Sequence, residues 1–179
     1  RRHFLLGYAD RTLGLRIPEK NRREGEVLRQ RLQKLGLWRK SGHEHFTGCL
    51  IVPLMDIGGG VVGLYGRRIG PVAKGSPHHL YLPGPHRGLF NPKAFESEEI
   101  ILCEAILDAL TFWVSGFRNV SCIYGTEGFT DELWEEILHR KVKRVRLAYD
   151  ADEAGNRAAE RDAKRFLAHG IEVYRVKFP

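Results

Sequence analysis

Hydrophobic and polar positions follow two different patterns along this chain of 179 residues. In residues 98–179, short apolar runs alternate with longer segments whose apolar positions recur every three or four residues. The runs predict strands and the longer segments predict helices. The expected strands are 100–103, 120–124, 145–149 and 171–176, and the expected helices are 105–115, 130–139 and 153–169. This alternation favours right-handed crossovers, so we expect an α/β fold with a Rossmann-like, parallel four-stranded sheet and flanking helices.

The first half of the chain has a less regular pattern. Its expected elements are a helix at 23–35, a β-hairpin formed by 49–55 and 61–66 around a Gly-rich turn, and a short strand at 79–82. Residues 1–20 are expected to be irregular. We therefore expect a smaller α+β lobe over residues 1–95 and the parallel-sheet domain over residues 96–179.

Charge divides the chain in the same way. Residues 1–95 hold 17 Lys and Arg against 6 Asp and Glu, whereas residues 96–179 hold 12 against 16. A basic lobe beside an acidic domain suggests a polyanion bound by the first and metal ions bound by the second. The alternative is two solvated surfaces that differ only in composition.

Several classes of protein are disfavoured. Three cysteines without a CxxC pair argue against a disulfide framework or a structural zinc site, and they fit a reducing cytoplasm. No apolar run reaches the roughly 18 residues that a membrane helix needs, so no membrane partner is expected. The chain begins without Met or a signal-peptide pattern, and we interpret it as part of a longer protein.

Acidic residues stand where the expected parallel strands end. Glu104 directly follows the first strand, Asp150 directly follows the third, and Asp152 comes two residues later. Asp108 lies one helical turn after Glu104. If the first and third strands are neighbours, these carboxylates converge, and divalent cations would relieve their repulsion. The alternative is that they only cap helices or lie in solvated first turns.

The segments Glu104–Leu110 and Tyr149–Gly155 resemble the two acidic motifs of TOPRIM domains. Outside them, His3–Ala9, Leu50–Arg68 and Pro77–Leu82 resemble, in order, the catalytic core of DnaG-type DNA primases. The resemblance covers nearly the whole chain. It implies a TOPRIM domain preceded by a basic lobe, with template and nucleotides between the two.

The resemblance also implies roles for individual residues. Glu104, Asp150 and Asp152 would bind Mg²⁺ or Mn²⁺, with Asp108 as a nearby support in the catalytic site. The implied nucleic-acid and nucleotide contacts are Arg67, Arg68, Lys74, His78 and Arg87. Arginines that the family carries in the stretch matching 46–49 are absent here, and His78 stands in place of a family lysine.

The activity that the resemblance implies is template-directed synthesis of RNA primers on single-stranded DNA by metal-dependent nucleotidyl transfer. Its partners would be a single-stranded DNA template, NTPs and a replicative helicase that binds regions outside this chain. Two alternatives remain open. One is DNA cleavage of the nuclease or topoisomerase type, and the other is a non-catalytic DNA-binding module of a mobile-element or plasmid replication protein.

Overall fold

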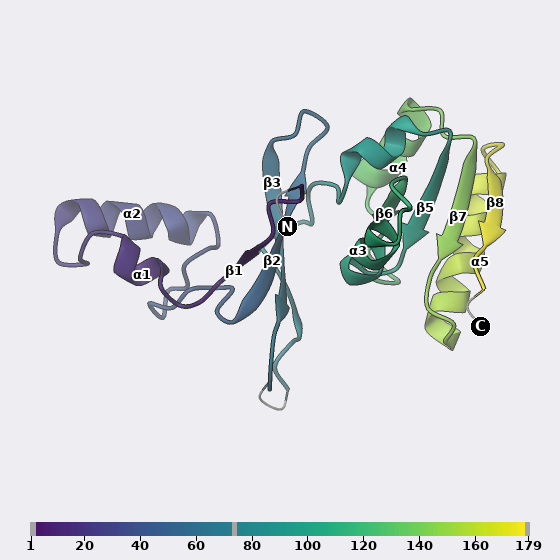
Figure 1. Cartoon of the computed structure of the whole chain (residues 1–179). Helices are drawn as coiled ribbons and strands as arrows, with labels where there is room; N and C mark the ends of the chain where they lie inside the picture. The colour runs from purple at the N-terminus through teal and green to yellow at the C-terminus, as the bar shows by residue number, and fades with distance from the viewer. Residues whose placement is uncertain (1–2, 73–74, 178–179) are drawn as a thin grey trace. The chain divides into compact units, whose positions relative to one another are not determined.

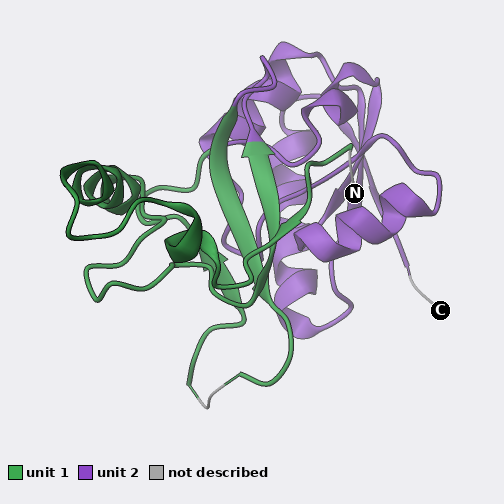
Figure 2. Cartoon of the chain, turned by 60° about the vertical axis from the view of Figure 1, so that its left-hand side comes forward, with its two compact units in different colours: residues 1–54, 61–87 green, residues 55–60, 88–179 purple. Residues whose placement is uncertain are grey.

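The computed structural model describes residues 3–72 and 75–177. Its contacts divide the chain into two compact units, which Figure 2 shows in different colours. Unit 1 comprises Arg1–Leu54 and Val61–Arg87, and unit 2 comprises Met55–Gly60 and Gly88–Pro179. Unit 2 resumes at Gly88, a few residues before position 96, from which acidic residues outnumber basic ones in the sequence.

Unit 2 contains the expected parallel sheet. Its strands are β5 (Glu99–Cys103), β6 (Val120–Cys122), β7 (Arg144–Ala148) and β8 (Glu172–Arg175). They lie in the order β6-β5-β7-β8, and every neighbouring pair is parallel (Figure 1). The first and third strands of the unit are therefore neighbours, which was the condition for the acidic residues to converge.

Three helices connect these strands as the sequence predicts: α3 (Ile106–Val114), α4 (Asp131–His139) and α5 (Glu153–Leu167). A 3₁₀ turn that the sequence did not predict, η1 (Pro92–Glu96), precedes β5. Right-handed crossovers place α3 on one face of the sheet and both α4 and α5 on the other. The rings of Trp134 in α4 and Phe166 in α5 lie 5.3 Å apart, as this arrangement requires.

Two helix starts are fixed by side chains that the sequence made recognisable. The Thr130 hydroxyl accepts a hydrogen bond from the Leu133 backbone N–H at 3.2 Å and so caps α4. The Asp152 carboxylate accepts one from the Gly155 N–H at 2.7 Å and so caps α5. Such caps satisfy backbone donors that have no partner within the helix.

The core of unit 2 explains why its strands were easy to predict. Ile100, Leu102, Val145 and Leu147 lie on one face of the sheet and are at most 1% exposed. In β5 the alternate residues Ile101 and Cys103 are buried as well, so this strand is buried on both faces. Strands buried on both faces carry nearly continuous apolar runs. The one buried carboxylate of α5, that of Asp162, accepts a hydrogen bond from the Tyr149 hydroxyl at 3.0 Å.

Unit 1 is built on a second sheet with the order β1-β2-β3-β4. Its elements are β1 (Gly7–Tyr8), α1 (Leu13–Arg16), α2 (Arg23–Lys34), β2 (Cys49–Met55), β3 (Val61–Arg68) and β4 (His79–Tyr81). Strand β1 pairs antiparallel with β2, and β3 pairs antiparallel with β4. The expected hairpin is present, and its turn is closed by the Asp56 carboxylate, which accepts from the Gly60 N–H at 2.8 Å.

The expectation that residues 1–20 are irregular was wrong at two places. β1 is a strand only because Gly7 pairs with Ile51, and α1 begins where the Glu44 carboxylate accepts from the Leu13 N–H at 2.9 Å. Both elements depend on partners more than thirty residues away. Local periodicity carries no signal of such partners.

All three cysteines, Cys49, Cys103 and Cys122, are free and buried. A small cluster of buried residues, Phe46, Cys49 and Leu80, supports the sheet of unit 1.

None of the described helices is both long and apolar enough to cross a membrane.

Candidate metal and nucleic-acid site

Four acidic residues of unit 2 lie where its neighbouring parallel strands β5 and β7 end. We call this region the acidic edge, and its residues are Glu104, Asp108, Asp150 and Asp152. Cys103, the last residue of β5, is the register partner of Ala148, the last residue of β7. Glu104 therefore leaves the sheet beside the segment that leads to Asp150. The carboxyl ends of neighbouring parallel strands are the usual place for a ligand in an open α/β sheet.

Glu104 is the most constrained of these acids. Its Oε2 atom is buried and has no hydrogen-bond partner among the described residues. Burial raises the pKa of Glu104, the charges of Asp150, Asp152 and Asp108 raise it further, and a hydrogen bond from the Asp150 backbone opposes them. A buried acceptor without a partner is unfavourable, and here it indicates a place for a cation or a donor.

The other three carboxylates surround Glu104 in different ways. Asp108, in the first turn of α3, has a pKa raised by burial and by the charge of Asp150. Asp150 is exposed, and Asp152 already caps α5 with one oxygen. None of the four forms a salt bridge with a described Lys or Arg.

Two residues that sequence reasoning missed hold the acidic turn in place. Arg175 in β8 donates from its guanidinium to the carbonyls of Tyr149 and Asp150, each at 2.8 Å. Gly155 approaches the Asp150 carbonyl so closely that a Cβ atom there would lie 2.3 Å from its oxygen. The register of β8 against β7 brings Arg175 to this turn, and nothing in the sequence around Arg175 signals it.

The residues present have the chemistry that a hard divalent cation requires. Mg²⁺ and Mn²⁺ take carboxylate oxygens and keep several waters, so one or two carboxylates suffice to hold them. Within the described residues, however, no group of three or more Asp, Glu, His or Cys side chains is arranged to hold a metal ion. The carboxylates are thus close enough for their charges to raise the pKa values of Glu104 and Asp108, but they do not form a complete coordination shell.

The predicted phosphate contacts of unit 1 lie on and around β3 and β4. Arg67 on β3 is the register partner of His79 on β4 and donates a hydrogen bond to His79 Nε2. The Nδ1 atom of His79 lies 2.9 Å from the hydroxyl oxygen of Tyr65. Burial and the charges of Arg67 and His78 lower the pKa of His79, which keeps the ring neutral and able to accept from Arg67.

The remaining predicted contacts are less well defined. His78 and Arg87 are exposed, and the His78 carbonyl accepts from the Arg68 N–H at 2.9 Å. Lys74 lies outside the described residues. Because successive residues of a strand point to opposite faces, Arg68 does not share the face of Arg67.

Comparison with known proteins agrees with this fold. The family model described as Toprim-like matches residues 101–179. Two DNA primases, from Aquifex aeolicus and Clostridium acetobutylicum, are each 30% identical over 99% of this chain and match 37% and 31% of their own lengths. The chain therefore spans about a third of these curated relatives.

The solved structures give the same result. The Aquifex aeolicus primase, solved as its zinc-binding and RNA polymerase domains, superposes with a TM-score of 0.78 and 29% identity, covering 99% of this chain and 46% of that one. The fold and the acidic edge together define a TOPRIM domain. Because the similarity extends over both units, the chain belongs to the DnaG-type primase family and corresponds to part of its catalytic core.

Proposed function

We propose that this chain forms the catalytic core of a DNA primase, which synthesises RNA primers on a single-stranded DNA template by metal-dependent nucleotidyl transfer. The observation that carries the proposal is the pair of neighbouring strand ends that present Glu104 and Asp150, neither of which forms a salt bridge with a Lys or Arg of the described residues. Similarity to a primase solved with its RNA polymerase domain supports the same reaction.

In this proposal, Glu104, Asp150 and Asp152 hold Mg²⁺ or Mn²⁺, and Asp108 supports them from α3. A divalent cation supplies charge stabilisation for in-line displacement at a phosphorus atom and so assists both the attacking and the leaving oxygen. A terminal 3′-hydroxyl forms the new phosphodiester bond at the α-phosphorus of an NTP, and pyrophosphate leaves. Arg67, oriented by His79, binds a phosphate of the template or the nucleotide.

The wider setting follows from the same proposal. The protein would work in the cytoplasm on single-stranded DNA, with NTPs as substrates. A replicative helicase would bind it through parts of the longer protein. Arg68, Lys74, His78 and Arg87 would add to the basic surface that follows the nucleic-acid backbone.

The decisive experiment measures ribonucleotide incorporation on single-stranded DNA by the full-length protein. Glu104→Gln keeps the side-chain shape and one acceptor oxygen but removes the charge, so metal-dependent incorporation should fall at least about a hundredfold. The matched control is Glu153→Gln, which removes an exposed acid that is paired with Arg157. Failure of the unmodified protein to incorporate any NTP with Mg²⁺ or Mn²⁺ would contradict the proposal.

A second candidate function is a non-catalytic DNA-binding module. It is favoured by the uncharged stretch 46–49, where the resemblance leads one to expect arginines, and by the incomplete coordination shell among the described residues. This candidate predicts salt-sensitive DNA binding that Asp150→Asn leaves unchanged, together with no incorporation. Metal-dependent DNA cleavage in the absence of NTPs would instead indicate a nuclease or topoisomerase-type activity.

A further inference from the structure

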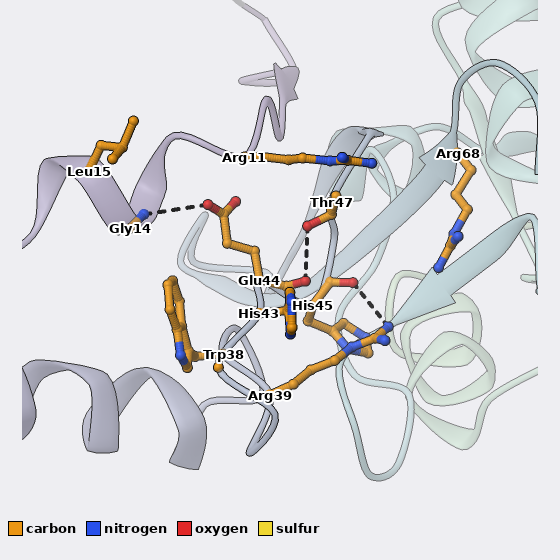
Figure 3. A pocket seen from close by; sticks show the side chains of 11 residues that line it. Arg11, Gly14, Leu15, Trp38, Arg39, His43, Glu44, His45, Thr47 and Arg68 are labelled. Carbon is orange, nitrogen blue, oxygen red and sulfur yellow. Dashed lines mark hydrogen bonds between the residues drawn. The ribbon is translucent and has the colours of Figure 1, made fainter. Parts of the chain in front are cut away.

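Unit 1 contains a pocket of about 470 Å³ that belongs to no part of the acidic site. This volume falls within the range of small-ligand sites. The lining residues used below are Arg11, Leu15, Trp38, Arg39, Thr47 and Arg68. Figure 3 shows the three arginines toward one end of the pocket, and Leu15 and Trp38 at the other.

The positive charge at the first end is not neutralised. Arg11, Arg39 and Arg68 form no salt bridge with any carboxylate of the described residues. The Arg39 guanidinium donates a hydrogen bond to the His45 carbonyl at 3.3 Å, which leaves its charge without a carboxylate partner among the described residues. Three guanidinium groups around one space repel one another, and an anion would relieve that repulsion.

Arg68 gives a second, independent indication of a ligand. Its Nε atom is buried and has no hydrogen-bond partner in the described part of the chain. A buried guanidinium donor without an acceptor costs about 1–3 kcal/mol. Arg68 and Arg39 line the same pocket, so their charges act on one space.

The single acid of the pocket is already engaged elsewhere. The Glu44 carboxylate accepts from the backbone N–H groups of Leu13 at 2.9 Å and Gly14 at 3.4 Å. Figure 3 shows it turned toward Gly14 and away from Arg39 and Arg68. Its charge is therefore stabilised by the start of α1.

The opposite end of the pocket offers an aromatic surface. Trp38 is half-buried, and its ring lies over α1, where a Cβ atom on Gly14 would come within 3.1 Å of it. Indole rings are effective stacking partners for nucleobases. A cationic end and an aromatic end in one pocket match the two halves of a nucleotide.

We propose that this pocket binds one nucleotide unit, with its phosphate among Arg11, Arg39 and Arg68 and its base against Trp38. The three arginines supply positive charge beside Thr47, a position in the stretch where the resemblance leads one to expect arginines. The site uses none of the acidic residues of unit 2. Its ligand binding is therefore independent of metal-dependent chemistry, and the two proposals can fail separately.

The test measures binding by the complete 179-residue chain in EDTA, so that no metal site contributes. Fluorescence anisotropy of a labelled oligothymidylate of about twelve nucleotides reports binding of a strand. Arg39→Gln and Arg68→Gln should each weaken it about tenfold and lower the salt dependence by about one ion. The matched control, Arg31→Gln, removes the same charge from the exposed face of α2 and should change affinity less than about threefold.

Two further probes identify the ligand. An abasic oligonucleotide should keep its dependence on Arg39 and Arg68 but lose its dependence on Trp38, which Trp38→Leu and the conservative Trp38→Phe measure. Calorimetry with ATP as the ligand tells whether a free nucleotide, or only a strand, enters the pocket. Arginine-dependent binding of either ligand supports the site. Equal affinities of Arg31→Gln, Arg39→Gln and Arg68→Gln for both probes, in variants that unfold at the wild-type temperature, would overturn the proposal.

Discussion

The acidic edge of unit 2 and the arginine pocket of unit 1 each hold side chains of like charge close together, but different parts of the fold position these side chains. At the acidic edge, Glu104 and Asp150 follow the ends of two neighbouring strands, β5 and β7, which pack into the core of unit 2 and whose register is fixed residue by residue. In the pocket, the arginines come from a loop near β1, a loop after α2 and the end of β3. The first arrangement is set by a core, and the second by loops and a small sheet.

This difference bears on what each region does. Chemistry at a phosphorus atom needs groups held within fractions of an ångström, which rigid strand ends provide. Binding a flexible strand needs charge and a stacking surface more than fixed distances. We therefore expect substitutions at the acidic edge to change the rate of reaction, and substitutions in the pocket to change affinity.

The largest expected effect separates the two regions directly. In the full-length protein, Asp150→Asn should lower the turnover number for NTP incorporation on the order of a thousandfold, about 4 kcal/mol, with little change in DNA affinity. Arg68→Gln should do the converse and raise the template concentration needed for half-maximal rate while the turnover number stays within about threefold. Steady-state kinetics with varied template measures both quantities. A large loss of turnover in Arg68→Gln would remove the distinction.

The second effect concerns the backbone of the acidic turn. Gly155→Ala places a methyl group against the Asp150 carbonyl, so unit 2 should lose about 2–3 kcal/mol of unfolding free energy as the turn shifts. Urea denaturation measures the loss. The neighbouring Ala154→Gly is the matched control and should cost about 1 kcal/mol or less through helix propensity. A Gly155→Ala variant as stable as the wild type would show that the turn yields easily.

The same contrast explains how far the sequence alone could predict the structure. The apolar runs around Ile100 and Val145 identified two strands of unit 2, and the alternation of strands with helices predicted a parallel sheet. The acidic motifs were recognisable in the sequence, but the order of the strands was left as a condition, because alternation alone does not say which strands are neighbours. The structure shows that β5 and β7 are neighbours, which brings the segments that carry Glu104 and Asp150 together.

The features that escaped prediction all depend on distant partners. Arg175 reaches the acidic turn only through strand register, and Glu44 caps α1 across about thirty residues of chain. The pocket arginines gather from three separate segments, so no spacing in the sequence connects Arg11 with Arg68. Whether the carboxylates complete a coordination shell depends on side-chain positions that strand order does not determine.

A smaller effect tests the electrostatics of the acidic edge without any substrate. Because the folded protein raises the pKa of Glu104 above its unfolded value, the fold loses stability as the pH rises from the unfolded pKa through the raised one, and the full loss is present above the raised pKa. Glu104→Gln should therefore stabilise the metal-free protein at pH 7 by about 1 kcal/mol or less. Thermal unfolding in EDTA measures this gain.

Adding Mn²⁺ makes the same measurement sharper. The wild type should gain stability with Mn²⁺ concentration, because a ligand that binds only the folded state raises the unfolding temperature. Glu104→Gln should gain little, whereas the Glu153→Gln control should respond as the wild type does. An unfolding temperature of the wild type that is indifferent to Mn²⁺ would argue against a metal site at this edge.

The smallest effect belongs to unit 1 and concerns the ring that orients Arg67. His79 has a pKa below its unfolded value of about 6.5, so its neutral form stabilises the fold above that pH, and this contribution is lost as the pH falls through the folded pKa. Protonation also removes the acceptor for Arg67 and adds a charge beside Arg67 and His78. In the wild type, DNA affinity that depends on Arg67 should therefore change as the pH falls below about 6.5. In His79→Gln this change should be smaller.

Two variants make that last measurement specific. Gln at position 79 retains an acceptor for Arg67 but does not titrate, so both stability and DNA affinity should become less dependent on pH between about 5 and 7. His43→Gln removes an exposed ring whose Nδ1 atom lies 3.3 Å from the Ser41 hydroxyl oxygen, and this variant should keep the wild-type pH slope of stability. If His79→Gln and His43→Gln give the same slope, protonation of His79 does not control the position of Arg67. The sheet of unit 1 would then orient Arg67 by itself, at any pH at which the sheet is folded.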